Sequence, residues 1–160
     1  MTRALAVLSL IASVLAASTL AASERYEGYY YPQITSEETF ERAIRTPPDP
    51  GRSVRVDFVT TLTLAQLEAP ESPRFVFFAK GTDADRLILV ALDDEVFSTL
   101  YRARAVMAQM TSNVRGGGFF TQDNLQYVAT FYDMLHLLGF RSLVISDGDS
   151  WSHRVTFTQN

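Results

Sequence analysis

RFVFFAKGTDADRLILVAL, residues Arg74 to Leu92, is the stretch that decides the fold. It consists of two apolar runs joined by a polar link, Gly81 to Asp85, that contains one glycine. Short apolar runs bounded by turn residues are typical of buried strands, and a link of this kind is typical of a hairpin. We therefore expect an antiparallel pair of strands at the centre of a sheet.

A second hairpin is predicted near the C-terminus, where FRSLVIS and WSHRVTFT flank the turn DGDS, residues 147–150. In the last run, apolar residues alternate with Ser152, Arg154 and Thr156, which indicates a strand with one buried face. His153 lies in register with the apolar set. It is therefore interpreted as a core or edge histidine, with a ligand role as the alternative.

The residues before the first hairpin predict three short elements. Thr35-Ser36-Glu37-Glu38 has the spacing of a capping box and predicts a short helix that ends near Arg45. The proline-rich stretch 46–51 cannot continue that helix. Residues 54–60 alternate between apolar and polar and predict a strand, and residues 63–68 predict a short helix.

Between the hairpins the apolar period changes from two to about 3.6 residues. This period predicts a long helix from Asp93 to Val114 and a second helix over 123–138. Gly139 follows at the position of a left-handed cap. RGGGFF, residues 115–120, reads as a linker between the helices. The alternative is an anion cradle, for which Arg115 is the only local cation.

These elements predict an α+β fold: an antiparallel sheet of about five strands built from hairpins, with two main helices packed on one face. The expected organisation has three parts. They are a signal peptide (1–23), an N-terminal arm with a short helix and a Pro-rich linker (24–53), and a single α+β domain (54–160).

The first 23 residues, MTRALAVLSLIASVLAASTLAAS, have the layout of a secretory signal. Arg3 precedes an apolar run, and small residues near Ala21 to Ser23 suit a signal peptidase. An uncleaved anchor is the alternative, because the uncharged run is near the ~20 residues that span a bilayer. We expect a periplasmic or secreted protein with no stable membrane span after cleavage.

The composition argues against several classes of partner and chemistry. The chain has no cysteine, which excludes disulfides, iron–sulfur clusters and thiol catalysis. Without Arg3, 13 basic residues stand against 18 acidic ones, a net charge of −5 that does not favour nucleic-acid binding. Lys80 is the only lysine. Genomic base composition accounts for this preference for arginine over lysine, and recognition of carboxylates by arginine is the alternative.

The aromatic arm supplies the candidate binding residues Tyr29, Tyr30 and Tyr31. Tyrosine suits interfaces because a large ring is buried while its polar tip stays accessible. Docking on the domain itself and contact with a partner are both open. Arg102 and Arg104 are a candidate carboxylate clamp, with a solvated helix face as the alternative.

Three acidic residues are candidate metal ligands. Asp93 and Asp94 follow a predicted strand, where metal-binding carboxylates often lie, and Asp147 belongs to the second turn. Helix capping and ordinary turn formation account for the same residues. No motif predicts a bound cofactor, and no group of residues predicts a catalytic site.

Five stretches carry a resemblance to a known group: EGYYYP, FAKG, LDDEVFSTLYRARAVMAQM, FYDMLHLLGF and SDG. They resemble small exported bacterial proteins that are often labelled molybdopterin-guanine dinucleotide biosynthesis protein A. That label implies a role in making the molybdenum cofactor. The nucleotidyltransferase of that name has a Gly-rich N-terminal loop followed by Arg-Met-Gly-x-Asp-Lys, which this sequence lacks, so no site residue is carried over.

The leading hypothesis is an exported accessory or binding module without catalytic activity, whose partner is a periplasmic or envelope protein. A carboxylate- or metal-dependent enzyme is the alternative from a different class. Molybdenum-cofactor biosynthesis, implied by the resemblance, is the third.

Overall fold

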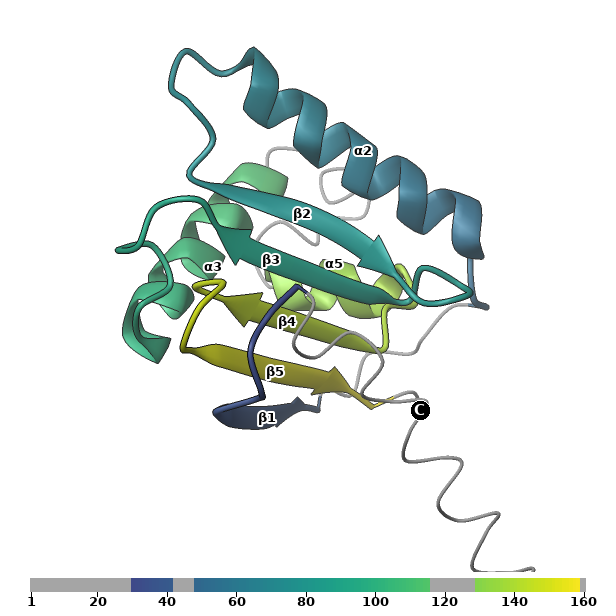
Figure 1. Ribbon diagram of the computed structural model, residues 1–160. Helices are drawn as coiled ribbons and strands as arrows, with labels where there is room; N and C mark the ends of the chain where they lie inside the picture. The colour runs from purple at the N-terminus through teal and green to yellow at the C-terminus, as the bar shows by residue number, and fades with distance from the viewer. Residues whose placement is uncertain (1–29, 42–47, 116–128, 159–160) are drawn as a thin grey trace, which may run out of the picture.

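The computed structural model describes residues 30–41, 48–115 and 129–158, which form one five-stranded sheet and three helices (Figure 1). The strand order is β1-β5-β4-β3-β2. In chain order the elements are β1 (Ser36–Phe40), α2 (Arg52–Glu68), β2 (Phe75–Lys80), β3 (Arg86–Ala91), α3 (Leu100–Arg115), α5 (Phe131–Leu137), β4 (Ser142–Ser146) and β5 (Ser152–Phe157).

Both predicted hairpins are confirmed. Strands β2 and β3 are antiparallel, in a register that runs from Phe75 opposite Ala91 to Lys80 opposite Arg86. Strands β4 and β5 are also antiparallel, and Ser146 lies opposite Ser152 next to the turn. The α+β class is therefore as expected.

The sheet is mixed, however, and the prediction of a purely antiparallel sheet is wrong. Strand β3 pairs with β4 in parallel, and β1 pairs with β5 in parallel. Between β3 and β4 the chain passes through α3 and α5, and such a crossover returns the next strand in the same direction. The two hairpins thus join through a parallel seam at the centre of the sheet.

The predicted helix that opens at Thr35 is wrong for the described residues 35–41, because they form edge strand β1. Thr35 does not cap a helix. Its Oγ1 donates to the Ser152 carbonyl at 2.6 Å, and its backbone N–H donates to the same oxygen at 2.9 Å. A partner strand 117 residues away supplies the hydrogen bonds that a helix would have made locally. Residues 42–45 lie outside the described residues.

The predicted strand over 54–60 is also wrong, since these residues belong to helix α2, which continues to Glu68. Arg55 and Val59, one helical turn apart, are 1% and 8% exposed and form the buried stripe. The hydroxyls of Thr60, Thr61 and Thr63 donate to the carbonyls four residues earlier. The helix thus tolerates β-branched residues because one face is buried and the threonine hydroxyls find backbone acceptors.

Two other helix boundaries differ from the expectation. Helix α3 begins at Leu100 rather than at Asp93, because residues 93–99 form turns. Helix α5 begins after Thr130, whose side chain makes a reciprocal capping box with Asp133. The predicted start of that helix at Asp123 and the glycines 116–118 lie outside the described residues. The left-handed cap at Gly139 is confirmed by its φ of +75°.

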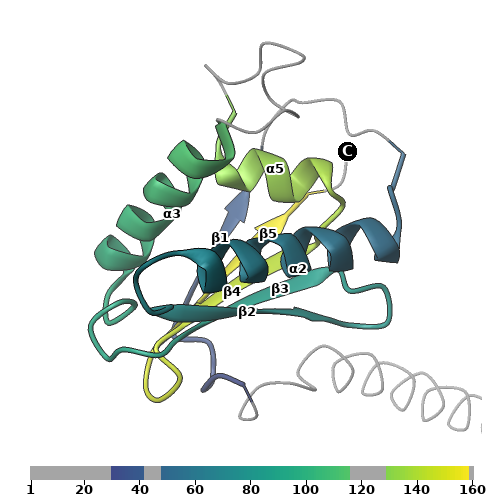
Figure 2. The same ribbon diagram turned by 90° about the horizontal axis from the view of Figure 1, so that it is seen from above.

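The main core lies between the sheet and the helices, which all cover the same face (Figure 2). Leu87, Leu143 and Val155 from three adjacent strands are fully buried there. On the opposite face, which we call the arm face, the segment before β1 packs on the sheet through Tyr31. None of the helices in the described residues is both long and apolar enough to span a bilayer.

Arg55 connects three parts of this architecture from a fully buried position. Its Nε donates to the Asp83 carbonyl in the β2–β3 turn at 2.9 Å. Its Nη1 donates to the Leu138 carbonyl after α5 at 3.2 Å, and it also pairs with Asp49. The buried guanidinium is therefore satisfied by backbone carbonyls and one carboxylate, as a buried charge requires.

Candidate functional site

The arm face carries a pocket with three arginines in its lining. Side chains alternate between the two faces of a sheet, so Arg86 in β3 and Arg154 in β5 project to the same side as Ile88 and Val144. Arg141, which directly precedes β4, joins them. The pocket has a volume of about 240 Å³, and its other lining residues include Tyr31, Asp85, Ser142 and Thr156. We call it the arginine pocket.

Arginines outnumber acids among the described residues that line the arginine pocket. Asp85 is the one acid among the described residues of its lining, and its Oδ2 pairs with the Arg141 Nε at 3.1 Å. At the rim, Arg154 Nη1 lies 4.0 Å from the Glu37 Oε2. The described lining therefore contains three arginines and one acid, with Glu37 at its rim, in a chain whose net charge is −4. Such a local concentration of positive charge in a concave surface attracts anions.

The tyrosine arm forms one wall of this pocket. Tyr31 is only 6% exposed and packs on Ile88 and Val144. The Tyr30 ring lies against Phe78, with 5.2 Å between ring centroids, and its hydroxyl accepts a hydrogen bond from Lys80 at 2.6 Å. Tyr30 and Tyr31 therefore dock on the domain, one of the two roles considered for the arm. Tyr29 lies outside the described residues.

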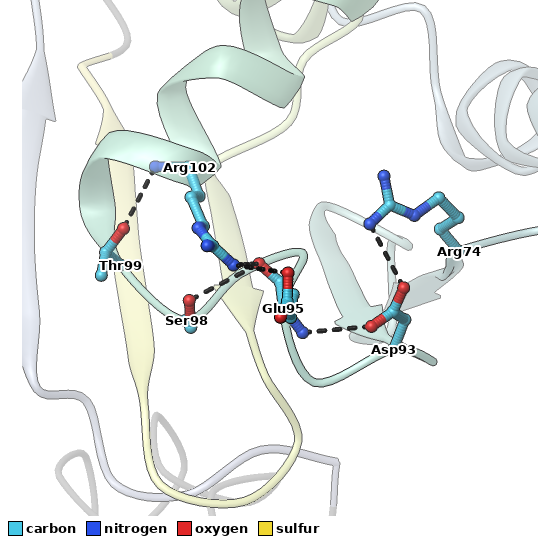
Figure 3. Close-up of polar contacts among 6 residues, drawn as sticks. All are labelled: Arg74, Asp93, Glu95, Ser98, Thr99 and Arg102. Carbon is cyan, nitrogen blue, oxygen red and sulfur yellow. Dashed lines mark hydrogen bonds and ion pairs between the residues drawn. The ribbon is translucent and has the colours of Figure 1, made fainter.

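Asp93 and Arg102, two of the predicted site residues, lie in and after the loop that follows β3 (Figure 3). Asp93 Oδ1 accepts from the Glu95 backbone N–H at 3.2 Å, and its Oδ2 pairs with Arg74 at 3.2 Å. The Glu95 N–H and the Arg74 guanidinium hold the pKa of Asp93 below its usual value. Asp93 thus orders the turn at the start of this loop rather than capping α3.

Arg102, in the first turn of α3, binds Glu95 of the same loop. Its Nη1 donates to the Glu95 carbonyl at 2.7 Å and lies 3.4 Å from the Glu95 carboxylate (Figure 3). A cleft of about 320 Å³ lies beside it, lined also by Arg74 and Val106. Both arginines of this cleft pair with acids of the loop that follows β3.

The structure does not gather Asp93, Asp94 and Asp147 into one site. Strands β3 and β4 are parallel, so Asp93 and Asp147 follow strand ends at the same edge of the sheet. Asp147, however, accepts backbone N–H bonds within its own turn, the shortest from Trp151 at 2.8 Å. Within the described ranges, no group of three or more histidine or acidic side chains is arranged to hold a metal ion.

The hydrogen bonds of that turn also set the pKa of Asp147. Burial alone would raise it, but the N–H groups of Trp151, Asp149 and Ser150, together with the Ser150 hydroxyl, hold the pKa below its usual value. The carboxylate is thereby kept ionised as the acceptor at the centre of the turn.

Arg104 binds a carboxylate, and that carboxylate belongs to this chain. Its Nη2 lies 2.9 Å from the Glu38 Oε2 on β1. The other Glu38 oxygen lies 3.5 Å from Nε2 of His153, whose Nδ1 is 2.8 Å from the Ser36 hydroxyl. The His153 ring is 2% exposed and stacks on Trp151. This cluster joins β1, β5 and α3, and it agrees with the interpretation of His153 as a core histidine.

Tyr132 in α5 lies close to the same cluster. Burial, followed by the negative charge of Glu38, raises its pKa to about 12, although Arg104 opposes the shift. The Tyr132 hydroxyl is therefore neutral across the physiological range.

Arg115, the last residue of α3, makes a structural contact. Its Nε donates to the Ala129 carbonyl at 2.9 Å, just before α5 begins. This bond connects the end of one helix to the approach of the next.

No known family matches this chain. The comparisons with curated proteins and with solved structures likewise give no match.

Sequence reasoning did not single out the three arginines of the pocket. One signal was present, because Arg154 and Thr156 alternate against the buried set of the last strand and must face away from the helices. The same alternation places Arg86 opposite the buried Leu87. The alternation does not give the strand order. Only the strand order shows that the three arginines lie on or next to neighbouring strands.

Proposed function

We propose that this chain is an exported binding module without catalytic activity, and that its ligand or partner is held at the arginine pocket. The observation that carries the proposal is the convergence of Arg86, Arg141 and Arg154 on one concavity beside Tyr31. Polar groups that converge on a concave surface are typical of binding sites.

The way other polar side chains are used supports binding rather than catalysis. Asp93 and Asp147 order turns, Glu38 joins a strand to a helix, and His153 is buried between Ser36 and Glu38. A general base must reach the proton that it removes from a substrate. These groups are instead engaged in contacts that hold the fold together.

The test is capture of a partner by the exported protein. The full chain, with a C-terminal affinity tag, is expressed in a Gram-negative host, crosslinked in the periplasm and purified. We expect the tagged protein in the periplasmic fraction, with bound material that is lost from an Arg141→Ala/Arg154→Ala double variant and retained by an Arg52→Ala control. Material bound equally by all three proteins would place the binding surface elsewhere. Retention of the protein in the cytoplasm would contradict export.

The resemblance to proteins labelled molybdopterin-guanine dinucleotide biosynthesis protein A gives a second candidate function. A nucleotide carries the negative charge that three guanidinium groups attract. If the chain handles guanine nucleotides, GTP should raise its thermal midpoint. An unchanged midpoint at millimolar GTP would remove this candidate. Native mass spectrometry of the same sample tests the metal-dependent alternative by showing whether a stoichiometric metal ion is bound.

A further inference from the structure

We propose that the contact between His153 and Glu38 is a pH switch, which holds edge strand β1 to the sheet more tightly when the His153 imidazole is protonated. The contact lies on the face that the helices cover, since Glu38 also pairs with Arg104 of α3. The arginine pocket lies on the arm face. The switch is therefore independent of the proposed function.

Strand β1 is the part of the sheet that can detach locally. It lies at the edge of the sheet, with β5 as its one neighbouring strand (Figure 1). None of its five residues is buried, whereas four of the five residues of β4 are. Elements with few buried contacts open at a lower free energy than the whole fold. A group that acts on the attachment of β1 therefore changes a local equilibrium.

His153 contacts β1 from the neighbouring strand through both of its ring nitrogens. The ring is 2% exposed, and its Nδ1 lies 2.8 Å from the Ser36 hydroxyl. The other nitrogen, Nε2, is buried without a hydrogen-bond partner in the described part of the chain, although Glu38 Oε1 lies 3.5 Å away. Buried polar atoms are normally hydrogen-bonded. One of the two contacts to β1 is therefore incomplete.

Protonation supplies what this contact lacks. Both nitrogens of an imidazolium are donors, so Nδ1 donates to the Ser36 hydroxyl oxygen while Nε2 donates to the Glu38 carboxylate. The hydroxyl suits both states of the ring, because it donates to a neutral nitrogen and accepts from a charged one. A charge-assisted hydrogen bond is about twice as strong as a neutral one. The gain exists only while β1 is attached, since Glu38 belongs to β1 and His153 to β5.

The charges around the ring set the direction of the effect. Burial of His153 and the positive charge of Arg104 oppose protonation, and the Glu38 carboxylate favours it. The Arg104 side chain is 59% exposed, so water weakens its field, and it binds the Glu38 oxygen that does not face His153. Tyr132 on α5 is neutral, and Trp151 stacks on the ring without a charge. The close carboxylate decides the balance, and acid strengthens the attachment.

The experiment measures hydrogen exchange of the backbone amides in the full chain at pH 5.5 and 7.5, corrected for the intrinsic effect of pH on exchange. Histidine is the side chain whose charge ordinarily changes in this range. We expect the protection of residues 36–40 to rise roughly threefold at pH 5.5, the factor given by an ion pair of ordinary strength. The protection of β3, at the centre of the sheet, should change by less.

Matched variants assign the effect to the pair. Glu38→Gln keeps an oxygen for Arg104 but removes the charge that faces the ring, and His153→Gln removes the titrating group. Each should abolish the gain in protection at pH 5.5. Glu37→Gln, at the neighbouring exposed position of β1, should preserve it. His136, the other histidine of the chain, is present in every variant, so a response that it causes would persist in all of them.

Circular dichroism shows whether each variant is folded, and Glu38→Gln alone decides if His153→Gln is not. A gain that persists in a folded Gln variant at either position of the pair would assign the pH response to another group. Equal protection of β1 at both pH values, or the same increase in β3, would show that no local switch exists. Loss of the gain in Glu37→Gln as well would make the acidic charge of the strand its cause.

Discussion

Arg55 Nη1 lies 2.5 Å from Oδ1 of Asp49, and the guanidinium of this pair is buried while the carboxylate is 64% exposed. The pair is therefore asymmetric. Asp49 keeps much of its hydration, whereas Arg55 depends on protein partners for nearly all of its hydrogen bonds. The Arg55 guanidinium, together with the Gly51 N–H, holds the pKa of Asp49 below its usual value.

Replacing Arg55 with methionine should destabilise the fold strongly. The substitution preserves much of the apolar stem but leaves the Asp83 and Leu138 carbonyls without their donor. We expect a loss of about 3 kcal/mol in the free energy of unfolding, measured by urea denaturation. Arg52→Met, at an exposed position of the same helix, is the matched control and should change stability by less than about 0.5 kcal/mol. Equal stabilities would show that Arg55 does not connect these elements.

Docking of the arm should contribute measurably to stability. Tyr31→Ala removes a ring that is 6% exposed and should lower the free energy of unfolding by about 3 kcal/mol. Tyr101→Ala, at a position that is 84% exposed, serves as the control and should leave the thermal midpoint nearly unchanged. A Tyr31→Ala protein as stable as the control would mean that the arm adds nothing to the fold.

Asp147 should make stability depend on pH in the acidic range. Its folded pKa is lowered from 3.8, so the folded state binds fewer protons than the unfolded state. The stabilisation is therefore fully present above pH 3.8 and is lost as the pH falls through the folded pKa. In urea unfolding between pH 3 and 7, Asp147→Asn should be less stable than the parent at neutral pH and should lose less stability on acidification.

Asp149→Asn is the control for that measurement, because it changes an acid in the same turn while its backbone N–H still donates to Asp147. It should follow the pH dependence of the parent protein. If Asp147→Asn also followed it, the turn carboxylate would have no part in the acid response.

Tyr132 should make stability depend on pH in the alkaline range. Its pKa rises from 10 to about 12 on folding, so the folded state holds this proton more tightly than the unfolded state. The stabilisation is present below pH 10 and is lost as the pH rises from 10 to 12. The stability difference between the parent and Tyr132→Phe should therefore shift by roughly 2 kcal/mol across that interval. Tyr101→Phe should show no such shift.

The hairpins could be predicted from the sequence because their information is local. In RFVFFAKGTDADRLILVAL, the strands and the turn that joins them are consecutive, and the pairing follows from the chain itself. The C-terminal hairpin is equally local, with its turn organised by Asp147.

The wrong predictions concern elements whose structure depends on contacts between residues far apart in the sequence. Residues 36–40 have the spacing of a helix start, and only pairing with β5 makes them a strand. In α2, the buried stripe includes Arg55, a residue type that is seldom buried, so the apolar alternation of Val54, Val56 and Phe58 was the stronger pattern. The arginine pocket was missed for the same reason, because three separate strands contribute to it.

The parallel pairing of β1 with β5 has a consequence for the way the chain acquires its final shape. Ser36 and His153 are 117 positions apart. Ser36 therefore lacks its pairing partner on β5 until almost the whole polypeptide has emerged. When the chain emerges from its N-terminus, the backbone N–H and C=O groups of TSEETF have no partner strand while the intervening segments fold. A nascent chain cut before Ser142 would lack both C-terminal strands and could not retain the first one.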